Sequence, residues 1–357
     1  MKKLLILVLV LIPWRVYAIG ASSYIVMDAS SNRVLEGSNI KDERLIASTT
    51  KIMTAIVAIE NKSLDEKVVV SKEVLKAYGS NIYIEVGEEL TLKDLLYGLM
   101  LRSGNDAAIE ISRVVAGDMD NMAKLMNEKA KALNMTNTLF INASGLENEE
   151  GLGNKSTAYD MALLMSYALK NKVFTQIIGT ENYKTQSSYK SYVWHNKNKL
   201  LGSYEYCIGG KTGFTKKARR TLVTAAKKED KTLVVVTLND PDDFADHKAL
   251  YEKNFKKYNL VKVLDKNSFK IDTQGTYDQV YLKNDLKVLL TSDEEKNIKI
   301  NYDLVKKDSY EDNEAVGSVV VKLKGKVIAK EDILARKNEK IQENFWHKVL
   351  DFLMFWN

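Results

Sequence analysis

Hydrophobic and polar positions follow two different periods along this chain. Near the start, residues 24–28 and 33–36 are short extended runs separated by Ala29-Ser30-Ser31-Asn32, which predicts a β-hairpin. Residues 52–59 are apolar almost all round, a pattern typical of a buried helix. The helical period continues after this point, and we expect further helices over residues 91–101, 106–115, 119–133 and 158–170.

The pattern changes to that of strands near residue 205. Extended runs cover residues 205–208, 221–226 and 232–238, and a helix is expected over 244–258. Strands therefore open and close this region, and helices fill its middle. This order predicts the α+β class, with an antiparallel sheet whose first and last strands are neighbours and a helical cluster packed beside it.

A small all-β module is expected to follow, over residues 261–336. Its short apolar runs are separated by stretches rich in Asn, Asp, Lys and Glu, and Lys324-Gly325 is typical of a hairpin turn. The runs lie at residues 280–282, 288–290, 298–302, 318–323 and 326–329. The module contains no cluster of residues with catalytic character.

Both ends of the chain have special patterns. Residues 1–18 combine a basic start, an apolar run and the small-residue site Val16-Tyr17-Ala18, which predicts a signal peptide cleaved after Ala18. An uncleaved anchor is the alternative. Residues 337–357 form the last segment, in which 341–356 are amphipathic at helical spacing. Sixteen helical residues reach about 24 Å, short of the ~30 Å membrane core, so we expect a helix lying on the membrane surface. A helix docked on the β module is the alternative.

These segments divide the chain into a signal peptide (1–18), a main domain (19–260), a β-rich domain (261–336) and a terminal helix (337–357). Loss of the first segment would lower the formal charge from +6 to +3, too little to indicate nucleic-acid binding. The single cysteine, Cys207, excludes an intrachain disulfide, and we expect it to be a small buried residue on a strand. The three histidines lie at no ligand spacing, so no metal site is expected.

Three short motifs carry the candidate chemistry: Ser48-Thr49-Thr50-Lys51, Ser103-Gly104-Asn105 and Lys211-Thr212-Gly213. The first pattern alone is weak, because Ser38 and Ser187 are also followed by a lysine three residues later. Context favours Ser48, because it opens the apolar helix and lies on the same face as Lys51. Burial in that helix would lower the pKa of the lysine and let it act as a base for the serine hydroxyl.

The other two motifs suit the rest of such a reaction. Ser103 can relay a proton to a leaving amine, and Asn105 can bond both Lys51 and a peptide group. Lys211 and Thr212 suit a substrate carboxylate, and Gly213 permits close approach of a ligand to the backbone.

The ordered trio resembles the active-site motifs of penicillin-binding enzymes and serine β-lactamases. The flanks are most similar to the low-molecular-weight D-alanyl-D-alanine carboxypeptidases. They include Ile46 to Ala55, Leu99 to Ala107, Asn142-Ala143-Ser144-Gly145-Leu146, Ser156 to Asp160 and Gly210 to Thr215. This resemblance implies a β-lactamase/transpeptidase-like fold. It also implies an oxyanion hole formed by the backbone N–H groups of Ser48 and Phe214.

The chain departs from the family's pattern at three places. Ile46 stands where proline is usual, and Asn154 and Lys155 replace a histidine before Ser-Thr-Ala. Arg219 stands where glycine is usual after the third motif, which matters if the backbone there needs a positive φ.

The resemblance implies an exported serine-type carboxypeptidase that removes the terminal D-alanine from peptidoglycan stem peptides through an acyl-enzyme on Ser48. Such an enzyme needs no cofactor, is acylated by β-lactams and works at the outer face of the cytoplasmic membrane. A β-lactamase is one alternative, for which Glu147, Glu149 and Glu150 are candidate deacylation residues without a recognisable motif. An inactive peptidoglycan-binding homologue is another, since Arg219 leaves room for a disturbed site.

Overall fold

The computed structural model describes residues 18–337, which fall into two compact units. The first unit contains residues 18–29, Val34–Lys228 and Thr232–Asn254. The second contains Ser30–Arg33, Glu229–Lys231 and residues 255–337.

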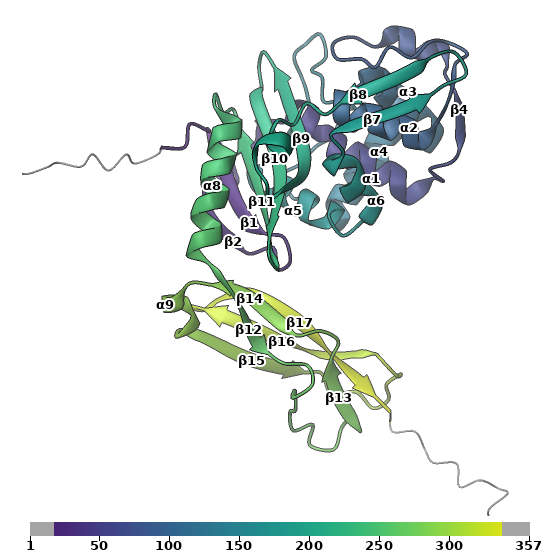
Figure 1. The fold of residues 1–357 in the computed structure, drawn as a ribbon. Coiled ribbons are helices and arrows are strands. Elements are labelled where there is room, and N and C mark those ends of the chain that lie inside the picture. Colours follow the sequence, from purple (N-terminus) through teal and green to yellow (C-terminus); the bar gives the residue numbers. More distant parts are fainter. Residues whose placement is uncertain (1–17, 338–357) are drawn as a thin grey trace, which may run out of the picture. The chain divides into compact units, whose positions relative to one another are not determined.

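A five-stranded sheet forms the centre of the first unit, in the order β2-β1-β11-β10-β9. Figure 1 shows the N-terminal β1 lying among strands from the later part of the chain. The pairings of β1 with β2, β1 with β11 and β9 with β10 are antiparallel. The predicted hairpin and the predicted neighbouring of first and last strands are therefore confirmed. The strands are β1 Ser23–Asp28, β2 Val34–Ser38, β9 Cys207–Thr215, β10 Arg219–Lys228 and β11 Lys231–Leu238.

Helices cover both faces of this sheet (Figure 1). Helix α8, Asp243–Lys257, packs on one face, where His247 and Tyr251 contact Thr224 of β10. The helical cluster lies on the other face, with α1 Lys51–Asn61 buried along residues 51–58. The cluster also contains α2 Leu92–Tyr97, α3 Asn105–Ala116, α4 Met119–Ala132, α5 Ala158–Ala168 and α6 Lys172–Gly179. The short helix α7 Leu200–Ser203 packs against β9.

Local sequence signals explain where several helices begin. Thr91 and Asp94 form both hydrogen bonds of a capping box before α2. Thr157 and Asp118 accept backbone N–H groups before α5 and α4. The predicted helix over 91–101 is correct in position, but its second half, Gly98–Arg102, widens into a π-type turn.

Several small elements were not predicted. They are α6, α7, the 3₁₀ turns η1 Ala47–Thr50 and η2 Lys72–Lys76, and the strand pairs β3 Arg44–Leu45 with β6 Lys155–Ser156, β4 Lys67–Val69 with β5 Glu89–Thr91, and β7 Asn182–Gln186 with β8 Ser191–His195. Cys207 lies on a strand as expected, at the start of β9, but it is partly rather than completely buried.

The second unit is built mainly of strands. One sheet has the order β13-β17-β16-β15, and β12 pairs with β14. The turn at Lys324-Gly325 joins β16 to β17 as expected, with Leu323 opposite Lys326. The elements are β12 Asn259–Leu264, β13 Gln279–Leu282, β14 Leu286–Leu290, α9 Ser292–Glu295, β15 Ile298–Leu304, β16 Ala315–Leu323 and β17 Lys326–Arg336.

The predicted amphipathic helix over 341–356 and the predicted signal peptide, apart from Ala18, lie outside the described residues. Within residues 18–337, no helix is both long and apolar enough to cross a membrane.

Candidate active site

The first motif lies on a strained turn before α1. Ser48 is part of the 3₁₀ turn Ala47–Thr50, and Ala47 has a left-handed φ of +46°. Such a conformation costs a residue with a side chain about 1–2 kcal/mol. Neighbouring contacts hold the turn in place. Gly145 lies so close that a Cβ on it would sit 2.0 Å from the carbonyl oxygen of Ala47, and the hydroxyl of Thr221 donates to the carbonyl of Ile46 at 3.1 Å.

Lys51 lies at the centre of the site and has no exposed surface. Its Nζ is 3.2 Å from the Oγ of Ser48 and 2.8 Å from the Oδ1 of Asn105. It also donates to the backbone carbonyl of Ser144 at 2.5 Å. One buried amine therefore connects the first motif, the second motif and the loop that contains Ser144.

The surroundings of Lys51 favour its neutral form. Burial is the main cause of a strong lowering of its pKa, and the positive charges of Lys211 and Lys197 lower it further. The negative charge of Asp106 raises the pKa of Lys51, but by less. A neutral amine that contacts a serine hydroxyl can accept the proton of that hydroxyl.

The second motif follows the π-type turn that ends α2. Ser103 takes a left-handed φ of +66°, and Asn105 begins α3. The Nδ2 of Asn105 donates to the carbonyl of Tyr78 at 2.6 Å, which fixes its Oδ1 toward Lys51. The Oγ of Ser103 is buried and has no hydrogen-bond partner within the described part of the chain.

The third motif lies on β9, where Lys211 is 1% exposed. Its Nζ donates to the carbonyl of Thr212 at 2.8 Å, and burial lowers its pKa to about 7, with a smaller contribution from Lys197. Gly213 is required for packing, because a Cβ there would lie 2.4 Å from the Oγ1 of Thr221 and 3.0 Å from the backbone N of Ser48.

The three motifs meet at a cleft of about 430 Å³. Five predicted residues line it, namely Ser48, Ser103, Thr212, Gly213 and Phe214. Lys51, Asn105 and Lys211 are buried and do not line the cleft. Lys51 and Asn105 are joined by a hydrogen bond. The cleft is also lined by Lys197, Lys199, Arg220 and Asp243, which the motif search did not identify.

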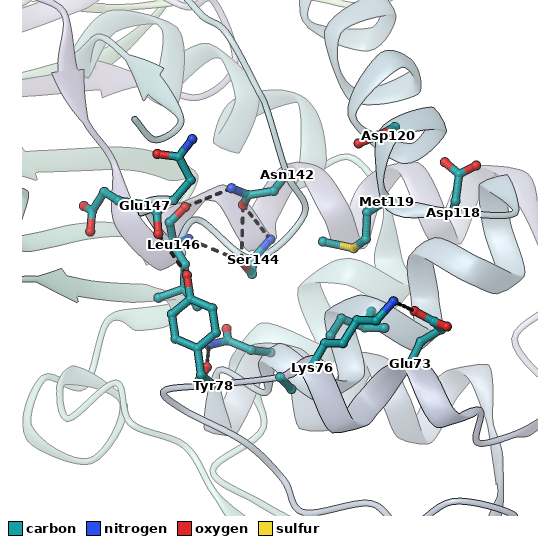
Figure 2. A pocket seen from close by; sticks show the side chains of 14 residues that line it. Glu73, Lys76, Tyr78, Asp118, Met119, Asp120, Asn142, Ser144, Leu146 and Glu147 are labelled. Atoms are coloured by element: carbon teal, nitrogen blue, oxygen red, sulfur yellow. Dashed lines mark hydrogen bonds and ion pairs between the residues drawn. The ribbon is translucent and has the colours of Figure 1, made fainter. Parts of the chain in front are cut away.

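The loop of residues 142–147, to which the sequence assigns no catalytic role, contacts Lys51 through the carbonyl of Ser144. Figure 2 shows the hydrogen bonds within this loop. Asn142 accepts the backbone N–H of Gly145 at 2.7 Å and donates to the carbonyl of Leu146 at 2.9 Å, so the loop turns sharply beside Lys51. The hydroxyl of Tyr78 donates to the carbonyl of Glu147 at 2.9 Å. Tyr78, Asn142, Leu146 and Glu147 line a second cavity of about 430 Å³, and Asn105 and Ser144 also line it.

Asn154 fixes the other end of the same loop. It is 1% exposed, and its Nδ2 donates to the Oγ1 of Thr50 at 2.9 Å and to the carbonyl of Asn142 at 2.8 Å. Its Oδ1 accepts the backbone N–H of Ile141 at 2.7 Å. The sequence identified Asn154 as a departure from the family's pattern, and the structure places it in direct contact with the element that carries Ser48.

The departure at Arg219 has a clear structural meaning. Arg219 begins β10 opposite Thr215 and has a φ of +61°, in the left-handed region that favours glycine. The expected positive φ is therefore present, and the arginine adopts it. The hairpin register places Phe214 opposite Arg220.

The two histidines within the described residues are not among the residues that line this cleft. His195 is exposed on β8 and contacts Asn182 through its Nδ1. His247 is fully buried between Thr224 and Thr237, and burial lowers its pKa to about 3. Within residues 18–337, no group of three His, Cys, Asp or Glu side chains is arranged to hold a metal ion.

Comparisons with known families match two segments of the chain. Residues 13–242 match the family described as D-alanyl-D-alanine carboxypeptidase, and residues 246–340 match the one described as penicillin-binding protein 5, C-terminal domain.

Individual relatives and structures agree with these matches. The chain is 35% identical over 222 residues to D-alanyl-D-alanine carboxypeptidase DacF of Bacillus subtilis, covering 60% of this chain and 56% of that protein. It is 29% identical over 365 residues to D-alanyl-D-alanine carboxypeptidase DacC of Escherichia coli, covering 94% of this chain and 88% of that protein. The crystal structure of a Mycobacterium tuberculosis D-alanyl-D-alanine carboxypeptidase superposes with a TM-score of 0.64 at 32% identity, covering 67% of this chain and 92% of that one. Penicillin-binding protein 5 of Haemophilus influenzae shares the fold at a TM-score of 0.74 and 22% identity, covering 90% and 98%.

Proposed function

Because the chain belongs to the D-alanyl-D-alanine carboxypeptidase family, we propose that it removes the terminal D-alanine from peptidoglycan stem peptides. One observation carries the proposal: a buried lysine, Lys51, whose Nζ lies 3.2 Å from the hydroxyl of Ser48. The reaction is a serine-type acyl transfer. The same chemistry makes the protein a target for acylation by β-lactams.

Acylation begins with proton transfer from Ser48 to Lys51, whose pKa is lowered by burial and by the charge of Lys211. The Oγ of Ser48 then attacks the carbonyl carbon between the two D-alanines. The backbone N–H groups of Ser48 and Phe214 donate hydrogen bonds to the carbonyl oxygen and stabilise the negative charge that develops on it. Each such donor is worth about 3–4 kcal/mol in the transition state. Gly213 on β9 lies close to the backbone N of Ser48. This proximity supports an oxyanion hole with one donor from the turn, Ser48, and one from the strand, Phe214.

Departure of D-alanine requires a proton on its amine. In the proposed reaction the hydroxyl of Ser103 relays that proton; its support is that Ser103 lines the cleft and that its Oγ has no partner among the described residues. Asn105 holds Lys51 and offers its amide to the peptide group of the substrate. The peptide lies along the edge of β9 at Thr212 and Gly213. After D-alanine has left, water hydrolyses the ester on Ser48 and releases the shortened peptide.

The alternative activity of a β-lactamase has less support. A deacylating glutamate would have to be available to a water molecule at the acyl group. The carboxylate of Glu147 accepts the hydroxyl of Thr215, and Glu149 and Glu150 are exposed on the loop. The inactive alternative is also disfavoured, because Ser48, Lys51 and Asn105 are in hydrogen-bond contact.

A product assay tests the proposal. The purified chain is given a peptide that ends in D-alanyl-D-alanine, and released D-alanine is measured. We expect release by the wild type and a loss of at least about 1,000-fold in Ser48→Ala and Lys51→Ala, because the nucleophile and its base act as a unit. Equal release by the wild type and Ser48→Ala would contradict the proposal.

We also propose that the protein acts outside the cytoplasm, at the outer face of the membrane, with residues 341–356 lying on that surface. The support is the apolar start of the chain and the amphipathic pattern at its end. Co-sedimentation with anionic lipid vesicles tests the second point. The full chain should bind, and a chain ending at Arg336 should not; equal binding by both would contradict it.

A further inference from the structure

Two neighbouring carboxylates of the first unit are buried without a cation. Asp240 has no exposed surface, and Asp246 is 2% exposed. No lysine or arginine of residues 18–337 forms an ion pair with either of them, and Arg220 pairs with Asp243 instead. The Oδ2 of Asp240 has no hydrogen-bond donor within the same residues. Burial raises the pKa of Asp240 to about 6, and the charge of Asp246 adds to this rise. Such a pair needs a shared proton or a cation.

The start of the described chain lies against this pair. The backbone N–H of Gly20 donates to the Oδ2 of Asp246 at 2.7 Å. A Cβ on Gly20 would lie 3.7 Å from the Oδ1 of Asp240, so both carboxylates are close to this one residue. Ser22 holds the segment in place, because its backbone N–H donates to the carbonyl of Asn239 at 3.1 Å and its Oγ accepts the Nδ2 of Asn239 at 2.8 Å.

The predicted cleavage after Ala18 would create a cation at this position. Ile19 would become the first residue, and its peptide nitrogen would become an α-amino group. That nitrogen is one residue from the N–H of Gly20, and consecutive Cα atoms are only about 3.8 Å apart. An α-amino group has an ordinary pKa of about 7.7–8.0, and nearby carboxylates favour its charged form. Removal of the signal peptide would therefore supply a positive charge beside two carboxylates that lack one.

The turn that contains Asp240 also supports the wall of the active-site cleft. The backbone N–H of Asp240 donates to the carbonyl of Arg220 at 3.0 Å, and its Oδ1 accepts the backbone N–H of Asp242 at 3.1 Å. Arg220 and Asp243 form an ion pair, and both line the cleft. A cation that binds Asp240 and Asp246 would thus hold the turn that leads into Asp243.

We propose that the α-amino group of Ile19, freed by removal of residues 1–18, binds the buried carboxylates of Asp240 and Asp246 and fixes the new N-terminus beside the cleft. The inference is independent of the proposed activity and rests on cleavage after Ala18. A metal ion fits the pair less well, because among residues 18–337 no third Asp, Glu, His or Cys is arranged with it to hold one. An α-amino group fits better, because the N–H of Gly20 already directs the start of the chain to Asp246.

The test compares two chains released from an N-terminal fusion, one that begins at Ile19 and one that keeps Ala18 as its first residue. Each is treated with cyanate at about pH 7, and carbamylation of the α-amine is followed by mass spectrometry of the N-terminal peptide. Cyanate reacts with the unprotonated amine, whose fraction falls about tenfold for each unit by which the pKa rises. We expect the amine of Ile19 to react at least about 10-fold more slowly than that of Ala18.

Substitutions of the carboxylates identify the partner of the amine. Asp240→Asn and Asp246→Asn should each speed the carbamylation of Ile19, whereas the exposed control Asp242→Asn makes the same change of charge and should not. Thermal unfolding gives a second readout that does not depend on the reagent. The Tm of the chain beginning at Ile19 should exceed that of the chain beginning at Ala18 by about 3–8 °C, and the double variant Asp240→Asn with Asp246→Asn should abolish this difference.

Two results would overturn the inference. One is an equal rate of carbamylation for the two chains, or a rate at Ile19 that neither carboxylate substitution changes. The other is an exported protein whose mass places its first residue elsewhere than Ile19. Release of D-alanine enters none of these measurements, so a failure of the proposed activity would be seen separately.

Discussion

The Nζ of Lys51 lies 3.2 Å from the Oγ of Ser48, inside a site where the lysine has no exposed surface. Two opposing requirements meet in this contact. A lysine that is buried enough to lose its proton must still find acceptors for its N–H groups when it is charged. The Oδ1 of Asn105 and the carbonyl of Ser144 provide them. The amine can therefore gain and lose a proton without leaving its place.

The charge of Lys211 should control the pH dependence of acylation. Lys211→Gln removes a positive charge that lowers the pKa of Lys51, so that pKa rises and the ascending limb of the pH profile moves to higher pH. Lys197→Gln should give a smaller shift in the same direction. The measurement is the second-order rate constant for acylation by a fluorescent penicillin across the pH range. A shift to lower pH in Lys211→Gln would contradict this account of the base.

Asn154 should be important for stability. Asn154→Ala removes the bonds to Thr50 and Asn142 and leaves the partly buried backbone N–H of Ile141 without its acceptor. We expect a loss of about 2–4 kcal/mol in the free energy of unfolding, because each unsatisfied buried group costs about 1–3 kcal/mol. Urea denaturation measures it. The exposed Asn121→Ala should cost less than about 1 kcal/mol, and an equal effect of both would show that the loop does not depend on Asn154.

Much of this architecture was predictable, because it depends on strong local patterns. The buried helix after Ser48, the helix that begins at Thr91 and the hairpin at Lys324-Gly325 are all predicted from the sequence. The hairpin β7–β8 was missed because the buried side of β8 consists of the aromatic residues Tyr192 and Trp194, whereas its one aliphatic residue, Val193, is exposed.

The site was predictable only in part, for a physical reason. Motifs report side chains, and they identified Ser48, Lys51 and Asn105. The carbonyl of Ser144 binds Lys51 through the backbone, which has no residue signature. Arg220 lines the cleft because of the register in which β10 pairs with β9. That register cannot be predicted from the spacing of residues in the sequence.

The left-handed conformation of Arg219 gives a prediction with a sign. Arg219→Gly relieves a φ of +61° that costs about 1–2 kcal/mol but adds about 0.5–1 kcal/mol of chain entropy, so we expect a gain near 0.5–1 kcal/mol in the free energy of unfolding. Arg219→Val should destabilise, because a β-branched residue tolerates this region poorly. Thermal unfolding of the three proteins measures the order. A glycine variant less stable than the wild type would show that the turn is not strained.

His247 should make the protein sensitive to acid. Burial lowers its pKa to about 3, below the unfolded value of about 6.5, so the unfolded chain binds the extra proton between these values. This group's contribution to stability is present above pH 6.5 and falls by about 1.4 kcal/mol for each pH unit below it. Asp240 has the opposite effect on stability, because burial raises its pKa from about 3.8 to about 6. Its contribution to stability therefore increases as the pH falls through this range.

The comparison with His247→Gln isolates the histidine. Unfolding by urea is followed at several pH values for both proteins. The wild type should lose more stability between about pH 6.5 and pH 4.5 than the variant, although the variant is less stable at neutral pH because Thr224 loses a partner. Parallel curves for the two proteins would contradict the assignment of a neutral, buried His247.

The central claim, an acyl-enzyme on Ser48, is tested most directly by mass spectrometry of the protein after incubation with benzylpenicillin. The account predicts one penicilloyl group per chain, located on the peptide that contains Ser48, and none in Ser48→Ala. A chain that stays unlabelled, or an adduct that persists in Ser48→Ala, would contradict it.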